Sequence, residues 1–380
     1  MSVEIKPVRT RRELRTFVNF PEKLYRDNPY YIPPLVFDQM DTLNQEKGAA
    51  QDFCDSRLYL AYKDGELAGR VAAIINRKAN AQWNHNEVRF GWYDFIEDFE
   101  VARALMEKVY EMGREYKMDT VVGPLGFTDF DPEGLLVDGY DRPGTMPLIY
   151  NHPYYKDFLE RMGFGKDADW VEFRITVPEK MPERFDRMSR LIAERANVHL
   201  RPLTRHMVLK EGYGLKIFHC INECYQDLYN FTRLPDHMAE KYIGFYLNIL
   251  DLRFVSLVEN EKNELIAFGI TMPSISKALQ KCRGKLFPFG WLRLLKSMFI
   301  KYEDTVEMLL IGVLPEYRNS GVISLIFMEL LRKFIDSGFT YAESNAMLEN
   351  NQQVLAMFEN FEHECKKRRR AYTKNLNISI

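Results

Sequence analysis

The sequence predicts a mixed α/β chain made of two tandem domains. Its 380 residues exceed the size of most single domains, so the length favours two. A similar order of strands and helices also occurs twice, with alternating apolar residues in the strands and apolar residues three or four apart in the helices. Equivalent points, such as Val3 and Val198 or Asn151 and Asn351, lie roughly two hundred residues apart. Because identity between the halves is weak, the repeat is predicted from the element order.

In the first half, Asp64-Gly65 is a strong hairpin signal between two strand patterns. The expected elements are, in order, a strand at 3–8, a helix at 11–25, the hairpin at 57–76, a strand at 87–96, a helix at 101–118, a strand at 119–124 and a helix at 154–163.

The second half follows the same order. Its expected elements are a strand at 198–204, a helix around 217–231, a hairpin at 253–273, a strand at 306–315, a helix at 322–337, a strand at 340–348 and a helix at 351–361. Between the halves, the polar segment 179–197 has helical apolar spacing and is expected to be a connecting helix. We therefore expect a first domain at 1–178 and a second at 198–380. The second carries an insertion at 274–301 that the first lacks.

Composition excludes several classes of protein. The net charge of −2 gives no general attraction to nucleic acid. The charged N-terminus and the absence of an apolar run of about 18 residues argue against secretion and membrane spanning. The five cysteines are scattered, and Cys220 and Cys224 have helical spacing without further ligands nearby, so packing is favoured over a metal site. The expectation is a reduced, soluble, cytoplasmic protein without a metal.

One turn in the second half has the features of an anion site. The stretch VLPEYRNSG, residues 313–321, leaves an apolar strand and leads directly into a long amphipathic helix. The first turn of a helix has unpaired N–H groups and the positive end of the helix dipole. Gly321 allows close approach of a ligand to the backbone, and Arg318 adds a positive charge. The alternative is an ordinary strand-to-helix junction.

This stretch resembles the acyl-CoA pyrophosphate loop of the GNAT superfamily of N-acyltransferases. The matching positions are Val313, Pro315, Tyr317, Arg318 and Gly321. Ile323 departs from the pattern, which has Gly or Ala there. The stretches FGWYDFIED, YNHPYYKDFLERMGF and KKRRRAYTK resemble a tandem, uncharacterised bacterial group of that superfamily, so the resemblance covers nearly the whole chain.

The resemblance implies two GNAT-like α+β domains, each with a mixed, mostly antiparallel sheet flanked by helices. It implies that acetyl-CoA or a longer acyl-CoA is the co-substrate and that a small-molecule amine is the acceptor. The residues that it assigns to acyl-CoA binding are Ile311, Gly312, Val313, Arg318, Asn319, Ser320, Gly321, Val322, Ile323 and Asn351. The first half has acidic residues where such a loop would stand, namely Asp94, Glu97, Asp98 and Glu100. Only the second domain is therefore expected to bind CoA, and the first is a degenerate copy.

Transfer of an acyl group to an amine requires a base for the ammonium and an acid for the departing thiolate. Glu307 lies eleven residues before Arg318, the spacing of the general-base Glu in the histone-acetylating branch of the resembled superfamily. Glu343 is a candidate second base and Tyr372 a candidate general acid. The alternatives are a solvent-facing strand residue for Glu307, a strand-end charge for Glu343 and a packed aromatic for Tyr372.

Two other segments each have a functional and a purely structural interpretation. The turn-rich loop of the first half places Tyr150, Asn151, Tyr154 and Tyr155 either at an acceptor pocket or in a packed loop. The run Lys366 to Arg370 either meets the CoA 3′-phosphate or is solvated charge.

The insertion 274–301 has seven Lys and Arg residues, no acidic residue and many large apolar residues. Such a segment lies on an anionic membrane, shelters an acyl chain or covers its own domain; the cover is favoured over peripheral membrane contact.

Two functions follow from these patterns. The first is an acyl-CoA-dependent N-acyltransferase with its chemistry in the second domain. The alternative is a non-catalytic acyl-CoA-binding or regulatory protein that retains the fold.

Overall fold

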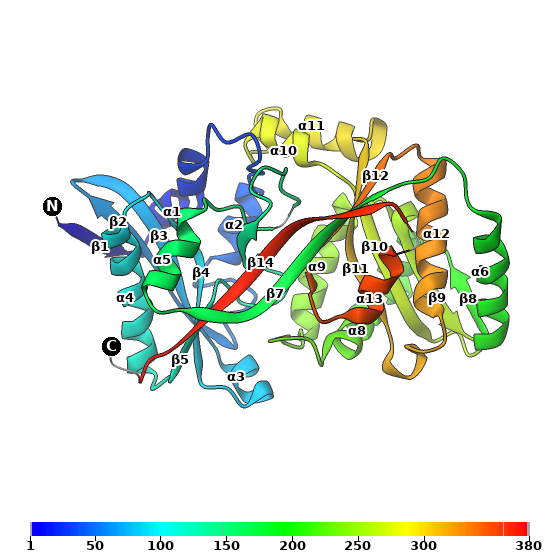
Figure 1. Cartoon of the computed structure of the whole chain (residues 1–380), viewed down its shortest axis with the longest axis horizontal. Coiled ribbons are helices and arrows are strands. Elements are labelled where there is room, and N and C mark those ends of the chain that lie inside the picture. The colour runs from blue at the N-terminus through cyan, green and yellow to red at the C-terminus, as the bar shows by residue number, and fades with distance from the viewer. Residues whose placement is uncertain (1, 147, 360, 378–380) are drawn as a thin grey trace. The chain divides into compact units, whose positions relative to one another are not determined.

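The computed structural model describes residues 2–146, 148–359 and 361–377, and it divides into two compact units. The first unit comprises Met1–Val171, Ala278–Trp291 and Lys366–Ile380, and the second comprises Glu172–Lys277 and Leu292–Cys365. Two strands, β7 (Gly165–Thr176) and β14 (His363–Asn375), each run from one unit into the other (Figure 1). Most of the closing strand, which was expected in the second domain, therefore belongs to the first unit.

The first unit is a sheet with helices on both faces. Its other elements are β1 (Val3–Pro7), α1 (Arg11–Leu24), α2 (Val36–Thr42), β2 (Cys54–Lys63), β3 (Glu66–Asn76), α3 (Arg77–Trp83), β4 (Glu87–Phe95), α4 (Phe99–Glu115), β5 (Thr120–Gly123), β6 (Leu135–Asp138) and α5 (Tyr154–Arg161). The strands follow the order β1-β2-β3-β4-β5-β14, with β6 also paired to β14. Strands β4 and β5 run parallel, whereas β1-β2, β2-β3, β3-β4, β5-β14 and β6-β14 pair antiparallel.

Helices α1 and α4 lie on opposite faces of this sheet, as two adjacent residues of β3 show. Successive residues of a strand point to opposite sides of its sheet. Arg70 Nη1 donates to the carbonyl of Phe17 in α1 at 2.9 Å. A Cβ at Gly69 would lie 2.7 Å from the side chain of Leu105 in α4. The glycine therefore lets α4 pack closely on the sheet.

The second unit has the same kind of layers. Its elements are α6 (Glu183–Ala196), β8 (Val198–Arg201), α7 (Arg205–Lys210), α8 (Tyr213–Tyr225), α9 (Asp236–Ile249), β9 (Val255–Asn260), β10 (Leu265–Pro273), β11 (Thr305–Val313), α12 (Val322–Asp336), β12 (Tyr341–Ser344), β13 (Met347–Leu348) and α13 (Gln352–Phe358), with 3₁₀ turns at Leu252–Phe254 and Pro315–Tyr317. The strand order is β7-β12-β11-β10-β9-β8, and β13 pairs with β7. Of the recorded pairs, β11 with β12 is parallel and the others are antiparallel. The predicted fold class, a mixed and mostly antiparallel sheet flanked by helices, is confirmed.

Helices α8 and α12 cover opposite faces of this second sheet. A Cβ at Gly269 would meet the side chain of Ile326 in α12, whereas one at Gly312 would lie 3.0 Å from Cys224 in α8. The predicted connecting helix is α6, which lies beside α12 (Figure 1), and its Ser189 hydroxyl lies 3.4 Å from the sulfur of Met328.

The insertion forms α10 (Ser276–Cys282), α11 (Gly290–Leu295) and one π-helical turn (Lys296–Ile300). Its middle part belongs to the first unit. Gln280 Nε2 donates to the carbonyl of Pro29 at 2.8 Å, and the Val36 amide donates to the carbonyl of Gly284 at 3.0 Å. Arg283 also forms an ion pair of 3.4 Å with Glu22. This part of the insertion therefore covers the first unit. Within the described ranges, no helix is both long and apolar enough to cross a membrane.

Candidate active site

The central strand of the second unit, β11, is irregular at the point where β12 leaves it. The register between β10 and β11 skips Leu309, which forms a β-bulge. The parallel pairing of β11 with β12 ends at the preceding residue, Met308, opposite Ser344. Beyond this pair, β11 continues with one backbone edge no longer paired to β12. Bulges of this kind often lie beside active sites, where they redirect side chains.

Glu307 lies at this break and is buried, with 3% of its surface exposed. Its Oε1 accepts hydrogen bonds from the hydroxyls of Ser274 at 2.7 Å and Ser276 at 3.2 Å. Its Oε2 has no hydrogen-bond partner among the residues that the structure describes. Burial raises the pKa of Glu307 to about 8, and the nearby charge of Glu343 also raises it, while the serine hydroxyls oppose the change. Glu307 can therefore gain or lose a proton near neutral pH.

Glu343 lies directly beside Glu307, because the two residues are paired between β11 and β12. Arg174 Nε donates to Glu343 Oε1 at 2.8 Å, and the Nη2 of the same guanidinium also contacts that oxygen. The guanidinium lies over the ring of Tyr341, 4.7 Å from its centroid. Glu343 thus has a positive counter-charge, whereas the serine groups around Glu307 are neutral. The two carboxyls therefore differ in the charge of their surroundings, and the role of each as a base stays a prediction.

The open edge of β11 carries the residues expected to bind the pantetheine arm, Ile311 to Val313. The Tyr225 hydroxyl of α8 donates to the carbonyl of Ile311 at 2.9 Å and accepts from its amide at 3.2 Å. Gly312 is paired with Phe268 of β10. Because strand residues alternate, the amide of Val313 faces the same edge as that of Ile311. Tyr225 therefore occupies part of this edge.

The turn before α12 contains most of the residues that were expected to bind the pyrophosphate of acyl-CoA. Gly321 is the N-cap residue, its φ is +83°, and no side chain caps the first N–H groups of the helix. Asn319 is exposed, and Ser320 donates its hydroxyl to the carbonyl of Tyr317 at 2.6 Å. Val322 is buried at the start of the helix.

Arg318 in the turn and Ile323 at the start of α12 both contact other parts of the second unit. Arg318 Nη2 donates to the carbonyl of Cys224 at 3.1 Å and lies 3.8 Å from Asp227. Ile323 packs against the hydrophobic core of the second unit. The departure from the loop pattern at Ile323 therefore places an apolar side chain on the core.

Asn351 is the N-cap of α13, and its carbonyl accepts from the amide of Leu355 at 3.1 Å. Its side chain makes no capping hydrogen bond. Asn351 thus lies at a helix start in the second unit, as the resemblance implies. Its contact with CoA stays a prediction.

Tyr372 lies in the first unit, in the part of β14 that pairs with Gly123 of β5. It is 1% exposed, it belongs to the hydrophobic core, and its hydroxyl lies 3.4 Å from Glu160. Burial raises the pKa of this hydroxyl, and the charge of Glu160 adds to the effect. The role of Tyr372 as a general acid stays a prediction.

The four candidate acceptor residues also lie in the first unit. Asn151 bonds to both the amide and the carbonyl of Leu136, at 2.7 and 3.0 Å, and so fixes β6. The hydroxyls of Tyr154 and Tyr155 both donate to the carbonyl of Phe95.

Tyr150 is the one of these four residues that lines a small pocket, of about 80 Å³. Its hydroxyl accepts from Asn28 at 2.7 Å. The role of all four residues in acceptor binding stays a prediction.

Four neighbours of the candidate site were not predicted, namely Arg174, Ser274, Ser276 and Tyr225. The two serines belong to no recognisable sequence motif. Arg174 and Tyr225 reach the site through the packing of β7 and α8. In the described part of the chain, no group of three His, Cys, Asp or Glu side chains is placed to hold a metal ion.

The second unit thus combines a central strand that contains a bulge, a neighbouring strand that leaves it, and a helix that starts after a glycine without a side-chain cap. Solved structures identify the fold in which these features occur as a tandem GNAT fold. A tandem GNAT protein from the clavulanic acid biosynthesis pathway matches over 100% of both chains, with a TM-score of 0.59 and 12% identity. A probable N-acyltransferase from Enterococcus faecalis matches 99% of this chain and 73% of its own, with a TM-score of 0.53 and 8% identity. The resemblance to the GNAT superfamily is thus confirmed at the level of the fold.

Two curated proteins are similar to this chain over nearly its whole length. Protein YghO of Escherichia coli is 27% identical over 378 residues, covering 96% of this chain and 94% of its own. A bacterial ceramide synthase of Caulobacter vibrioides is 25% identical over 381 residues, covering 98% of both chains. No family model matches the sequence.

Proposed function

We propose that the protein is an acyl-CoA-dependent N-acyltransferase, with CoA bound and the reaction carried out in the second unit. The observation that carries this proposal is Glu307, a buried carboxyl with an unpartnered oxygen and a raised pKa beside the bulge of β11. A group with a pKa near the working pH is an efficient general base. The fold supports the same reaction class, because the solved proteins that share it include a tandem GNAT protein and a probable N-acyltransferase.

In the proposed reaction, Glu307 takes a proton from the ammonium of the acceptor. The free amine then attacks the thioester carbonyl, the carbon–sulfur bond breaks, and the thiolate of CoA leaves and takes up a proton. The product is an amide. The positive charge of Arg174 offsets the negative charge of Glu343 beside Glu307. The hydroxyls of Ser274 and Ser276 fix the orientation of the Glu307 carboxyl.

The uncapped start of α12 suits the pyrophosphate of CoA. Its first N–H groups have no side-chain cap, and the positive φ of Gly321 leaves the turn without a Cβ. Arg318 is close enough to add positive charge, although it is now held by the carbonyl of Cys224. In the proposed complex, the Arg318 side chain leaves this carbonyl and turns toward the pyrophosphate.

We further propose that the acceptor is a long-chain amine. This proposal is supported by the similarity to a protein named as a ceramide synthase over 98% of both chains. A ceramide is a long-chain amino alcohol whose nitrogen carries an acyl group, so its formation is an N-acylation. Acyl groups longer than acetyl are expected for the same reason.

Tyr225 favours the second candidate function, a non-catalytic acyl-CoA-binding protein. Its hydroxyl holds both polar backbone groups of Ile311, which the resemblance assigns to the pantetheine arm. Binding of CoA through the start of α12 alone does not need this edge, whereas transfer needs the thioester to be held beside it.

The two functions are separated by incubating the protein with acetyl-CoA or palmitoyl-CoA and a panel of amines that includes sphinganine. Release of free CoA thiol should require both substrates and should be greatest with the long-chain pair. Isothermal titration with each acyl-CoA is run in parallel. Binding without amine-dependent thiol release would support the non-catalytic function, and absence of binding would contradict both.

A further inference from the structure

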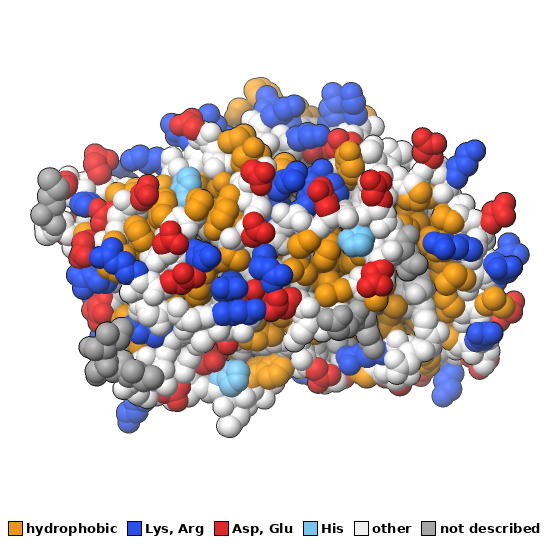
Figure 2. Space-filling view, in the orientation of Figure 1, with side chains coloured by type: hydrophobic (Ala, Val, Ile, Leu, Met, Phe, Trp, Pro, Cys, Tyr) orange, Lys and Arg blue, Asp and Glu red, His pale blue; other side chains and the backbone are white. Residues whose placement is uncertain are grey.

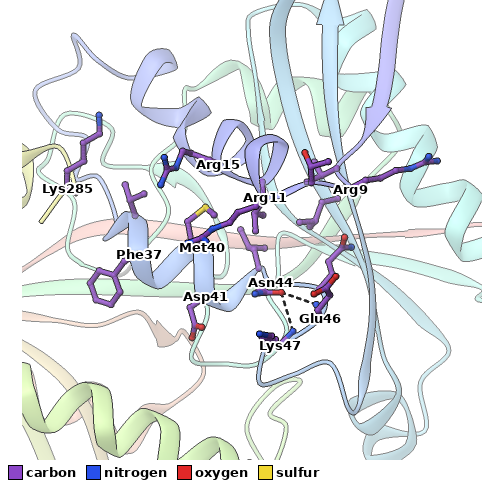
Figure 3. A pocket seen from close by; sticks show the side chains of 18 of the residues that line it. Arg9, Arg11, Arg15, Phe37, Met40, Asp41, Asn44, Glu46, Lys47 and Lys285 are labelled. Atoms are coloured by element: carbon purple, nitrogen blue, oxygen red, sulfur yellow. Dashed lines mark hydrogen bonds between the residues drawn. The ribbon is translucent and has the colours of Figure 1, made fainter. Parts of the chain in front are cut away.

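The first unit contains a pocket of about 760 Å³ between α1, α2 and residues 284–287 (Figure 3). Pockets of this size bind small molecules or parts of larger ones. Five of its lining residues are cationic and two are acidic; the cations are Arg9, Arg11, Arg15, Lys47 and Lys285, and the acids are Asp41 and Glu46. A cleft with such an excess of one sign concentrates ligands of the opposite charge.

The cations are presented by fixed elements. Arg11 and Arg15 are four residues apart on α1 and therefore share one face of the helix. Figure 3 shows the side chains of Arg11 and Arg15 near Met40 of α2, whereas Arg9 extends away. The lining also includes the buried apolar residues Val8, Leu14, Leu43 and Leu58. The pocket thus combines cationic and apolar side chains.

Large aromatic side chains are exposed along the rim of this pocket and in the adjoining residues of the insertion. Phe287 is 81% exposed and Phe289 68%, while Phe37 is 45% and Trp291 43% exposed. Figure 2 shows apolar and basic side chains together over α10 and α11. Side chains of this size are seldom left in water in a group unless they bind something.

The exposed aromatic residues are not on a loose tail. Hydrogen bonds from Val36 to Gly284 and from Gln280 to Pro29 tie the insertion to the first unit. The segment 274–301 contains seven Lys and Arg residues and no acidic residue. Exposed aromatic residues beside an excess of cations are typical of surfaces that rest on anionic lipid.

We propose that this face of the first unit docks on a membrane containing anionic phospholipids. Phe287, Phe289 and Trp291 enter the interfacial region of the bilayer, where aromatic side chains are favoured. Arg11, Arg15 and Lys285 bind headgroup phosphates in and around the pocket. A site for a soluble phosphate would leave the exposed aromatic rim without a role, so a lipid surface accounts for more of the observations. The inference goes beyond the proposed function and does not depend on it.

The test is vesicle flotation of the full chain without acyl-CoA. Vesicles of phosphatidylcholine with about 30% phosphatidylglycerol should carry the protein upward, whereas pure phosphatidylcholine vesicles should not. Raising the salt to about 0.5 M should weaken binding, because it screens exposed charges. The double variants Arg11→Glu with Arg15→Glu and Phe287→Ser with Phe289→Ser should each reduce the bound fraction at least about tenfold.

The matched control is Arg26→Glu with Lys117→Glu, two exposed residues of the first unit outside the pocket lining, which gives the same change in net charge. This control should still float. Melting curves of all variants establish that they remain folded. The fluorescence of Trp291 should shift to the blue with anionic vesicles, and Trp291→Phe should remove that shift.

Three results would overturn the proposal. The first is no flotation with anionic vesicles at low salt. The second is flotation that neither double variant reduces, or that the control reduces equally. The third is a rise in melting temperature with inorganic phosphate that depends on Arg11 and Arg15, without vesicle binding, which would identify a site for a soluble anion.

Discussion

At the scale of single residues, the environment of Glu307 decides how the proposed chemistry depends on pH. The carboxyl is buried beside a second carboxyl, Glu343, and within the described ranges its hydrogen bonds come from neutral serines at one oxygen. Each of the first two features disfavours the charged form. A base of this kind is protonated at mildly acidic pH and becomes active as the pH rises.

We predict that Glu307→Gln lowers kcat about 10²- to 10⁴-fold, the usual effect of removing a general base. In the wild type, kcat/KM should rise with pH through an apparent pKa of about 8, because only the deprotonated carboxyl accepts a proton. The measurement is the pH–rate profile of thiol release for both proteins with one amine, since ionisation of the amine affects both equally.

The controls are Ser276→Ala and Glu343→Gln, which leave Glu307 in place but alter its surroundings. Removal of the Glu343 charge should move the apparent pKa downward, because that charge raises it, and Ser276→Ala should move it upward. A profile of the Glu307→Gln variant that keeps both the rate and the inflection of the wild type would exclude Glu307 as the base.

The same proton links Glu307 to stability. Its pKa is about 8 in the folded protein, against an ordinary value of 4.5. Between these values the folded state holds a proton that the unfolded state has lost, so the free energy of unfolding should fall as pH rises from 4.5 to about 8. Glu307→Gln cannot ionise and should be more stable than the wild type at about pH 9, by roughly 2–4 kcal/mol.

Urea unfolding of both proteins between pH 5 and about 9 checks this prediction. The two curves should approach each other toward the acidic end, because the unfolded state regains the proton of Glu307 as the pH falls toward the ordinary value of 4.5. An equal pH dependence in wild type and variant would show that another group, such as the buried Asp131, controls it. Burial raises the pKa of Asp131 to about 7.

The sequence predicted the residues of this site unevenly. Glu307 and Glu343 were found because each lies at a fixed place relative to a recognisable motif, and the structure brings them side by side. Ser274 and Arg174 could not be found, because they meet Glu307 and Glu343 through tertiary packing of strands far apart in the chain. Tyr372 was named from the same resemblance, yet its strand lies in the first unit.

At the scale of elements, the start of α12 is where acyl-CoA binding can be tested. The helix begins at a glycine with a positive φ and without a side-chain cap. We predict that Gly321→Asp weakens CoA binding at least about tenfold, because a carboxylate at the helix start opposes the phosphates and occupies the N–H groups. The measurement is isothermal titration with CoA.

Gly321→Asn is the matched control, since Asn and Asp have the same shape and both tolerate a positive φ better than other residues. Any Cβ at this position lies 3.4 Å from Ile192, so both variants bear the same steric cost. Affinity should be weaker in the Asp variant than in the Asn variant. Equal losses would mean that shape rather than charge matters, and no loss in either would remove this turn as the CoA site.

Most of the elements were predicted from apolar spacing, including the hairpins and the helix now seen as α6. The helix α9, Asp236–Ile249, was not predicted, because it has little amphipathic contrast. The bulge at Leu309 could not be predicted either, since nothing in the apolar run VEMLLIGV distinguishes one extra residue from a regular strand.

At the scale of the whole molecule, the two units do not follow the order of the chain. Residues Lys366–Ile380 belong to the first unit, and Glu172–Thr176 of β7 belongs to the second. A sequence pattern shows that a segment is a strand but not which sheet accepts it, because the backbone hydrogen bonds are alike in both. The repeat therefore predicted two domains without predicting that each is completed by a strand from the other half.

Because β14 completes the sheet of the first unit, we expect residues of this strand to contribute to the stability of that unit. Ala371 and Tyr372 are buried in its core, with 0% and 1% of their surfaces exposed. We expect Tyr372→Ala to destabilise the first unit by about 3–5 kcal/mol, as for other large aromatic residues removed from a core. Hydrogen exchange should then increase at the amides of β3, β4 and β5, while β9, β10 and β11 of the second unit keep their protection. Loss of protection confined to the second unit would mean that the closing strand completes that sheet instead.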